Sequence, residues 1–300
     1  MSVEERRLLV VVAHPDDESF GMAGLIARYT RENAGVYLIC ATNGDVGTVD
    51  PQFMEGYNSV AERRLAELDC AARTLGFARV FTFGYRDSGM AGSPDNHHPD
   101  ALVTASLDEV TARVVAVIRE VRPQVVITFD PYGGYGHPDH IRIHEAAVAA
   151  FHAAGDPAYH SEWIDETLPP YSPQKLYFSV FNRGWLKPIV RLMPLFGQDP
   201  SRFGRNHDID LRAIAAQQFP IHARVRTRAY EEIARQARDC HASQLPLQGT
   251  SQRLSLLNLY QRLWNWLSPA EHTFMRAYPP VNGGHHQVER DLFQGVDLSR

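Results

Sequence analysis

Two short stretches of the chain carry histidine and aspartate at a spacing that suits metal binding. One reads Ala-His-Pro-Asp-Asp-Glu at residues 13–18, and the other reads Gly-His-Pro-Asp-His at residues 136–140. Within each stretch, the first histidine and the residue three positions later would point the same way on a helical turn that begins with proline. Imidazole nitrogens and carboxylate oxygens around an open position are typical of catalytic zinc. The sequence therefore predicts a divalent metal site assembled from both stretches.

We assign His14, Asp17 and His140 as the three metal ligands. Two imidazoles and one carboxylate favour Zn²⁺, and the same ligands also suit Fe(II) or Mn(II). A bound metal would lower the pKa of a water molecule from 15.7 to about 7 and polarise a carbonyl oxygen. Asp16 cannot share the face of its neighbour Asp17, so it is assigned as the general base.

Three further residues complete the expected catalytic group. His137, when protonated, would stabilise an oxyanion or protonate a leaving amine. Asp139 would orient His137 by a hydrogen bond to the other ring nitrogen, as carboxylates near metal sites do. Tyr135 lies on a glycine-flanked loop, from which its hydroxyl could donate to the same oxyanion.

Either stretch alone would also fit a turn whose aspartate caps the following helix. The presence of both, each directly after an apolar run, favours a functional site. Other histidines are expected to be solvent-exposed rather than ligating. These are His97, His98, His144, His152, His285 and His286.

The apolar runs before the two stretches predict buried strands. Residues 8–12 and 125–129 lack polar alternation, which is typical of parallel strands covered on both faces. Other strands are predicted at 36–41, 80–83 and 176–181, and helices at 19–31, 58–75, 107–121 and 138–151. This alternation predicts an α/β fold, a Rossmann-like open and mostly parallel sheet with helices on both faces. The first and fourth strands would be neighbours at the switch point, where their loops face each other.

The bulk composition is that of a soluble globular protein. The 300 residues are 44% hydrophobic and 22% charged, and we expect one domain over 1–300. Its core would span about 1–181, and a mainly helical elaboration about 182–300, with helices near 223–241 and 254–267. A net charge of −5 without a basic stripe argues against a nucleic-acid partner. No apolar run is long enough to span a membrane.

The three cysteines are far apart in the sequence. Cys40, Cys70 and Cys240 form no Cys-x-x-Cys pair, and this odd set predicts a reducing compartment without disulfides. Cys40 ends an apolar run and is expected in the core. The acidic N-terminus has no apolar signal segment, so the expected location is cytoplasmic. The sequence is compatible with a homo-oligomer.

The two stretches resemble the signatures of the LmbE-like, or PIG-L, family of metal-dependent N-deacetylases. The similarity covers about 1–151 and includes Thr-Asn-Gly-Asp at 42–45 and Arg-Leu-Ala-Glu-Leu at 64–68. Arg-Asp-Ser-Gly-Met at 86–90 is similar to the branch that acts in mycothiol metabolism. Cys-His-Ala-Ser-Gln at 240–244 resembles a late family segment that reaches back to the site.

The resemblance implies a Rossmann-like fold and a zinc ion. It implies the same metal ligands that the spacing of the residues suggests, with Asp16 as the base and His137 as its electrostatic or acid partner. It also implies residues that contact the substrate. Arg64 and Asp87 match positions that hold the sugar or inositol part, and Gln244 lies on the segment that reaches the site. Asp45 stands where relatives usually carry glutamate, and its shorter side chain reaches less far toward a substrate.

The expected function is hydrolytic removal of an N-acetyl group from an amino sugar, such as an N-acetylglucosamine derivative. Zinc would activate the water and Asp16 would act as the general base. One alternative is a mycothiol S-conjugate-type amidase of the same family, and another is a non-catalytic sugar-binding protein that retained the metal. An intact Asp16 disfavours the binding protein. A nucleotide-binding protein is also disfavoured, because no Gly-x-Gly-x-x-Gly follows the first strand.

Overall fold

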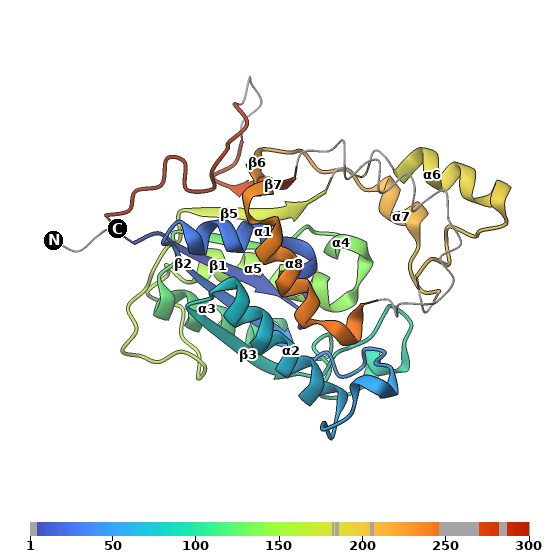
Figure 1. Ribbon diagram of the computed structural model, residues 1–300. Helices are drawn as coiled ribbons and strands as arrows, with labels where there is room; N and C mark the ends of the chain where they lie inside the picture. The colour runs from blue at the N-terminus through green and yellow to red at the C-terminus, as the bar shows by residue number, and fades with distance from the viewer. Residues whose placement is uncertain are drawn as a thin grey trace.

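A seven-stranded sheet forms the centre of the computed structural model (Figure 1). Its order is β3-β2-β1-β4-β5-β7-β6, in which β1 to β5 run parallel and β7 runs antiparallel to both of its neighbours. The strands are β1 (Arg7–Val12), β2 (Gly35–Thr42), β3 (Arg79–Tyr85), β4 (Val125–Phe129), β5 (Lys175–Val180), β6 (Ala223–Arg226) and β7 (Glu271–Tyr278). The structure describes residues 5–181, 183, 186–204, 207–245, 270–281 and 287–299.

Helices cover both faces of the sheet, as expected for the α/β class. The first face packs against α1, α2 and α8, and the second against α3 and α5 (Figure 1). The helices are α1 (Asp17–Arg31), α2 (Val60–Leu75), α3 (Leu107–Val121), α4 (Gly133–Gly136), α5 (Pro138–Ala153), α6 (Leu186–Leu192), α7 (Leu211–Ala216) and α8 (Glu231–Cys240). A 3₁₀ turn at Ala242–Gln244 follows α8. The predicted Rossmann-like fold is therefore confirmed.

Strand β1 is buried on both faces, which explains its unbroken apolar sequence. Leu8, Val10 and Val12 contribute to the core beneath α1, α2 and α8. Leu9 and Val11 contribute to the opposite core beneath α3 and α5. All five side chains are fully buried, and each such burial stabilises the fold by roughly 1.5–3 kcal/mol.

The order of the strands positions the two polar stretches. Strand β1 pairs with β2 on one side and with β4 on the other, so the chain reverses its direction of winding between β1 and β4. The loop after β1 and the loop after β4 consequently open at the same edge of the sheet. The predicted switch point is confirmed.

The C-terminal third departs from the predicted helical pattern. Residues 223–226 form β6, and helix α8 begins only at Glu231. Ala223 and Val225 point into the core while Arg224 and Arg226 do not, so this segment has the period-two pattern of a strand. Strands β6 and β7 were not among the predicted elements. The helix predicted at 254–267 lies outside the described residues.

The expectation of no disulfide is wrong, because Cys70 of α2 and Cys240 of α8 form one. The two residues are 170 positions apart, so only the packing of α8 against α2 brings them together. Cys40 is a free, fully buried thiol, which confirms its predicted place in the core. No helix among the described residues is long and apolar enough to cross a membrane.

His144 is buried, which corrects the prediction that it is exposed. It lies one helical turn after His140 and therefore shares the face of α5 that packs on the sheet. Its Nδ1 lies 2.8 Å from the carbonyl oxygen of Phe129. His152 and His97 are exposed as predicted, and His98 is partly exposed. The pair at 285–286 lies outside the described residues.

Candidate metal and active site

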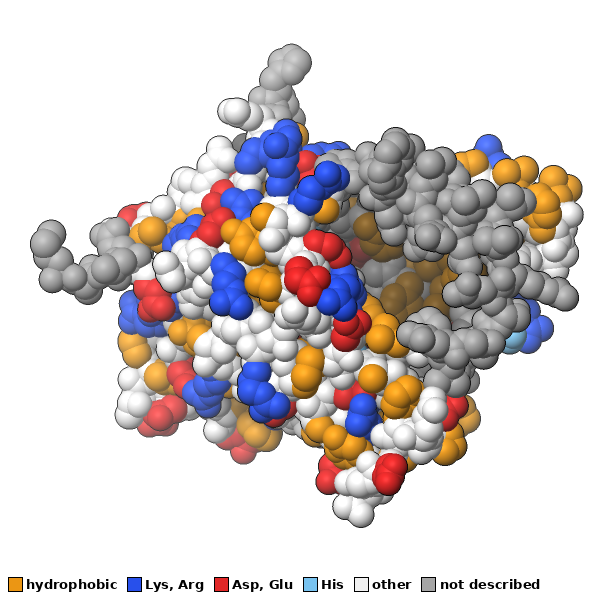
Figure 2. Space-filling model, in the orientation of Figure 1, with side chains coloured by type: hydrophobic (Ala, Val, Ile, Leu, Met, Phe, Trp, Pro, Cys, Tyr) orange, Lys and Arg blue, Asp and Glu red, His pale blue; other side chains and the backbone are white. Residues whose placement is uncertain are grey.

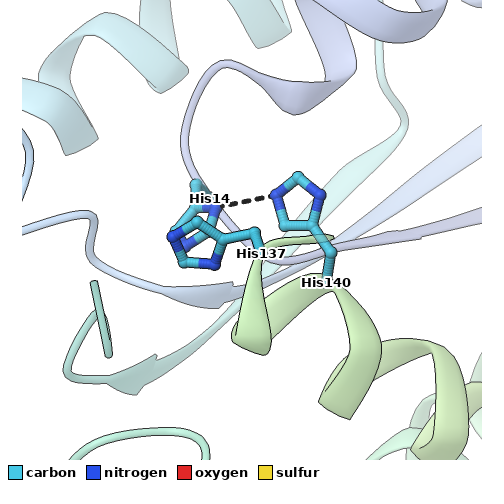
Figure 3. A group of neighbouring side chains, drawn as sticks. All are labelled: His14, His137 and His140. Carbon is cyan, nitrogen blue, oxygen red and sulfur yellow. Dashed lines mark hydrogen bonds between the residues drawn. The ribbon is translucent and has the colours of Figure 1, made fainter. Parts of the chain in front are cut away.

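Three predicted ligands come together at the edge of the sheet where β1 and β4 end. Nδ1 of His14 lies 3.1 Å from Nε2 of His140 (Figure 3). Oxygens of the Asp17 carboxylate lie 3.3 Å from that His140 nitrogen and 3.6 Å from that His14 nitrogen. The two ring nitrogens and the Asp17 carboxylate, which turns Oδ1 toward His140 and Oδ2 toward His14, thus form a small triangle of donor groups, although His14 and His140 are 126 positions apart.

The size of this triangle fits a zinc ion. Zinc bonds of about 2.0–2.1 Å in tetrahedral geometry place two ligand atoms roughly 3.3–3.4 Å apart. The observed separations of 3.1, 3.3 and 3.6 Å lie near that value, the last two being measured to different oxygens of Asp17. His137 also lies near these donors, and it groups with His14 and His140 and, separately, with His14, Asp87 and Asp139 (Figure 3). The group with Asp87 and Asp139 faces Nε2 of His14, which already lies 3.1 Å from Asp139.

The charges around the triangle also fit a cation. Burial lowers the pKa of His14, but the surrounding carboxylates of Asp87, Asp139 and Asp17 outweigh burial and hold it well above its usual value. Burial raises the pKa of Asp17, but His140 and His14 outweigh it and hold that pKa well below its usual value. The cluster therefore attracts positive charge, which a divalent metal would supply.

In the rings of His14 and His140, one nitrogen each is engaged in a hydrogen bond. His14 uses Nε2 toward Asp139, and His140 uses Nδ1 toward the carbonyl oxygen of Gly133, at 3.2 Å. Each ring is left with its other nitrogen as a lone-pair donor inside the triangle. Gly133 has φ +68°, and a Cβ there would lie 2.9 Å from Cβ of His140, so glycine is required. The ring of His140 also stacks on Phe129 at 3.9 Å.

The structure gives Asp139 a different partner from the one predicted. Its carboxylate accepts from His14 and from the backbone and hydroxyl of Ser88, rather than orienting His137. The backbone N–H of Asp139 donates to Nδ1 of His137 at 3.2 Å. The carboxylate nearest to Nε2 of His137 belongs to Asp87, at 4.0 Å. The predicted partner of Asp139 was its sequence neighbour His137, whereas the observed partner, His14, lies 125 positions away.

Asp16 presents its carboxylate beside the triangle from a strained backbone. Its φ is +133°, a conformation that costs a non-glycine residue about 1–3 kcal/mol. Although it precedes α1, its side chain makes no capping bond, and Nη2 of Arg64 donates to it at 2.9 Å. Burial raises the pKa of Asp16 to about 6, against the opposing charge of Arg64. This carboxyl can exchange protons near neutral pH.

His137 and Tyr135 offer hydrogen-bond donors on the other side of the site. Because Nδ1 of His137 accepts from the backbone, its Nε2 carries the proton in the neutral ring. Burial lowers the pKa of His137 well below its usual value, and the nearby His14 and His140 lower it further. Burial also raises the pKa of Tyr135, so its hydroxyl stays protonated. Both groups therefore remain neutral donors.

A cavity of about 650 Å³ opens above these groups. In Figure 2 the surface is hollowed on the side of α8 that faces α4 and α7 in Figure 1. The predicted residues that line the cavity are His14, Asp16, Arg64, Asp87, Tyr135, His137 and Gln244. Its volume lies within the roughly 300–1,000 Å³ typical of small-molecule sites.

Asp45 is not among the residues that line this cavity. Its carboxylate accepts from Arg86 at 2.8 Å and from the backbone N–H of Asp87 at 2.9 Å. It therefore holds the loop that carries Asp87. Gly44, beside it, has φ +62°, and a Cβ there would lie 2.3 Å from the Arg64 guanidinium, so that only glycine lets Arg64 reach Asp16.

Sequence reasoning missed several residues of the site. Ser88 is fully buried and binds Asp139, and its place beside Asp87 in the Arg-Asp-Ser-Gly stretch was the available signal. Met90 also lines the cavity from that loop. Asp208 and Ile209 line it from the C-terminal third, and no spacing in the sequence pointed to them.

A family model and two similar proteins all point to the same group of deacetylases. Residues 9–151 match the family PIG-L, described as GlcNAc-PI de-N-acetylase. A Rhodococcus erythropolis protein named 1D-myo-inositol 2-acetamido-2-deoxy-alpha-D-glucopyranoside deacetylase is 36% identical over 99% of both chains. A Geodermatophilus obscurus protein of the same name is 39% identical over 97% of this chain and 98% of its own.

Two solved structures share the fold at lower identity. One is N,N'-diacetylchitobiose deacetylase from Pyrococcus horikoshii, with a TM-score of 0.61 and 20% identity over 90% of this chain and 83% of its own. The other is a conserved protein from Thermus thermophilus, with a TM-score of 0.57 and 22% identity over 92% of this chain and 96% of its own. At these identities the likeness concerns the fold alone.

Proposed function

The chain belongs to the PIG-L, or LmbE-like, family of N-deacetylases, and on that premise we propose that it deacetylates an N-acetylglucosaminyl-inositol. The proposed substrate is 1D-myo-inositol 2-acetamido-2-deoxy-α-D-glucopyranoside, which the names of its relatives specify. The products are acetate and the free amino sugar. The observation that carries the proposal is the donor triangle of His14, Asp17 and His140 beside the Asp16 carboxylate.

We propose zinc as the metal, held by that triangle. When bound, it would polarise the amide carbonyl and lower the pKa of the attacking water. The Asp16 carboxylate takes the proton that this water loses as its oxygen forms a bond to the carbonyl carbon. A pKa near 6 leaves the carboxylate ionised at neutral pH and still basic enough for this task. The same carboxyl then returns the proton to the nitrogen as the carbon–nitrogen bond breaks.

Neutral donors stabilise the oxyanion that develops on the former carbonyl oxygen. Nε2–H of His137 faces the cavity because the opposite ring nitrogen accepts from the backbone of Asp139. The hydroxyl of Tyr135, whose ring lies edge-on to His137 at 5.9 Å, supplies a second donor. A preorganised donor of this kind contributes about 3–4 kcal/mol to the stabilisation of a transition state.

Polar side chains on the cavity wall suit the hydroxyl groups of a sugar and an inositol. We propose that Arg64, Asp87 and Gln244 bind these hydroxyls. Asp45 would act indirectly, because it fixes the loop of Asp87. Hydrogen bonds to the charged groups of Arg64 and Asp87 would contribute about 1.5–3 kcal/mol each, and one to the neutral amide of Gln244 about 0.5–1.5 kcal/mol.

The test is a substrate panel read by the release of primary amine and of acetate. The panel contains the N-acetylglucosaminyl-inositol, N-acetylglucosamine, and a thiol conjugate of the kind that an amidase would cleave. We expect the inositol compound to be hydrolysed with the highest kcat/KM, and the reaction to stop in Asp16→Ala. Preference for the conjugate would favour the amidase, and unchanged activity of Asp16→Ala would remove the base from the proposal.

A further inference from the structure

Asp16 needs support from outside its own loop. Its backbone φ of +133° is unfavourable for a residue other than glycine, and its carboxylate makes no capping hydrogen bond to α1. The backbone N–H of Asp16 instead donates to Oε2 of Glu18 at 3.0 Å. This bond closes a tight turn in which the glutamate, two residues later, reaches back to hold the strained backbone. The direction of the Asp16 side chain therefore depends on where the Glu18 carboxylate lies.

Glu18 is placed for this structural task and not for contact with substrate. It is fully buried and does not line the cavity. Its other oxygen, Oε1, accepts from the hydroxyl of Ser19 and from Nε2 of His241 at 2.7 Å. A buried carboxylate is costly unless it is paired, and the histidine supplies that pairing. One oxygen thus holds Asp16 while the other is held from a distant part of the chain.

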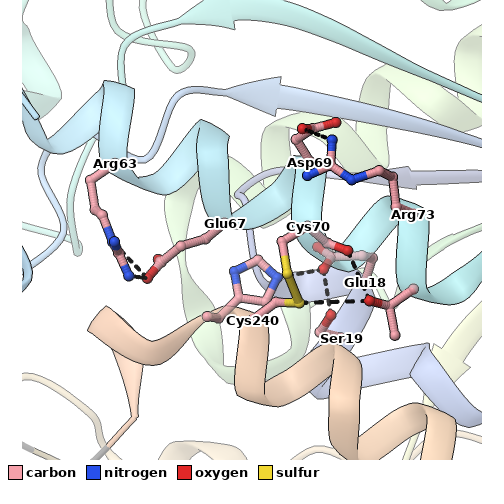
Figure 4. The surroundings of a disulfide bond; sticks show 10 residues. Glu18, Ser19, Arg63, Glu67, Asp69, Cys70, Arg73 and Cys240 are labelled. Atoms are coloured by element: carbon pink, nitrogen blue, oxygen red, sulfur yellow. Dashed lines mark hydrogen bonds and ion pairs between the residues drawn. A yellow bond between two sulfur atoms is a disulfide. The ribbon is translucent and has the colours of Figure 1, made fainter. Parts of the chain in front are cut away.

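His241 directly follows the end of α8, between residues that are bonded to α2 on either side of it. It is fully buried, and within the described residues its Nδ1 has no hydrogen-bond partner, so Nε2 makes its single polar contact. The residue before it, Cys240, is joined to Cys70 of α2, and Figure 4 shows this disulfide beside Glu18. On the other side of His241, the backbone N–H and the hydroxyl of Ser243 donate to the carboxylate of Glu67 in α2.

We propose that Glu18 and His241 are positioning residues that set the geometry of Asp16 for proton transfer, an inference that rests on the proposed function. The path runs from α8 through His241 and Glu18 to the backbone of Asp16. Neither residue lines the cavity, and the hydrogen bonds that join them to the site run to the Asp16 backbone and to each other. The assignment gives the C-terminal third a part in catalysis that lies 223 positions from the motif it supports.

The experiment compares variants that break the path with variants that preserve it. His241→Phe keeps a ring but removes the donor, whereas His241→Gln keeps an N–H at similar reach. Glu18→Ala removes all three hydrogen bonds of the carboxylate, whereas Glu18→Gln keeps an oxygen for the Asp16 N–H. Should Glu18→Ala fail to fold, the other three variants carry the test. His144→Phe is the matched control, because it replaces a buried histidine that bonds only a backbone carbonyl outside the path.

We expect His241→Phe to lower kcat by about 10- to 100-fold, since small errors in the position of a catalytic group cost that much. KM and zinc content should stay within about twofold of the wild-type values, since contacts to substrate and metal are intact. The Gln variants should recover most of kcat. Zinc content and the unfolding temperature are measured on every variant, so that the readout does not depend on activity alone.

The inference fails if His241→Phe keeps the wild-type kcat, or if its loss merely tracks a loss of thermal stability that His144→Phe shows equally. It also fails if the Gln variants are as inactive as Phe. Each of these results leaves the proposed function standing, provided that Asp16→Ala is inactive. If Asp16→Ala itself is fully active, the proposed function fails instead, so the two failures are distinct.

Discussion

Nε2 of His14 lies 3.1 Å from Oδ2 of Asp139, and both side chains are buried. The carboxylate accepts a hydrogen bond from the Nε2–H of the ring, which leaves Nδ1 of His14 with its lone pair on the side of Asp17 and His140. The two bonded residues are 125 positions apart. The bond therefore exists only after β1 and α5 have packed, which links the readiness of the metal site to completion of the fold.

This bond predicts that Asp139→Ala weakens zinc binding by about 10- to 100-fold, because the imidazole of His14 loses its orientation and preferred tautomer. Titration of the metal-free protein with zinc against a competing chelator measures the change. Asp139→Asn is the matched control. Its amide oxygen can still accept from His14, and its NH₂ can face the hydroxyl of Ser88. Equal zinc affinities of the Ala variant and the wild type would contradict this role.

Tyr135→Phe tests the proposed donation to the oxyanion. We expect kcat to fall by about 10²- to 10³-fold with little change in KM, as when one oxyanion donor is removed from other hydrolases. The ring still packs edge-on against His140 at 5.0 Å, so the unfolding temperature should stay near that of the wild type. Steady-state kinetics on the inositol substrate supply the measurement. A rise in KM alone would assign the hydroxyl to substrate binding.

Features that depend on local spacing could be predicted from the sequence. The observed bounds of β4 and α3 are the predicted ones, 125–129 and 107–121, because an unbroken apolar run and a helical apolar period each identify their element. The meeting of His14 with His140 follows from the same information, since the doubly wound topology brings the ends of β1 and β4 together.

Features that depend on long-range packing could not be predicted. The short segment at 223–226 was assigned to a helix because the strand that pairs with it, β7, lies far along the chain, from Arg226 opposite Glu271 to Ala223 opposite Phe274. The partner of Asp139 was misassigned for the same reason, since the sequence shows His137 nearby and does not show His14. The link from His241 to Glu18 likewise appears only when α8 packs on α1 and α2.

Acid should destabilise the fold partly through His272 of β7. Burial lowers the pKa of this histidine to about 4, in spite of a hydrogen bond with the Gly21 backbone. The unfolded chain takes up this proton near pH 6.5, whereas the folded chain does so only near 4. Between these values the unfolded state binds more protons, so the free energy of unfolding decreases as the pH falls from about 6.5 toward 4.

Thermal unfolding between about pH 7 and pH 4.5 measures this effect in the wild type and in His272→Phe. The variant lacks the titrating group, so its unfolding temperature should decrease less steeply over that range. His152→Gln, which changes an exposed histidine, should keep the wild-type slope. Identical slopes for the wild type and His272→Phe would show that this histidine takes up its proton equally in both states.

The disulfide between Cys70 and Cys240 should stabilise the attachment of α8 to α2. Cross-linking residues 170 positions apart restricts the unfolded chain, and such bonds contribute about 2–4 kcal/mol to the free energy of unfolding. The double variant Cys70→Ser with Cys240→Ser should therefore unfold at a lower denaturant concentration than the oxidised wild type. Thiol titration of the denatured wild type should find one free thiol, that of Cys40.

Reductant supplies the control for this prediction. It should shift the denaturation midpoint of the wild type toward that of the double variant and leave the double variant unchanged. Activity should survive reduction in large part, since Ser243 remains bonded to Glu67 and His241 to Glu18. The prediction would be contradicted by three free thiols in the denatured wild type, or by a denaturation midpoint that does not change with reductant. Either result would mean that packing alone joins α2 and α8.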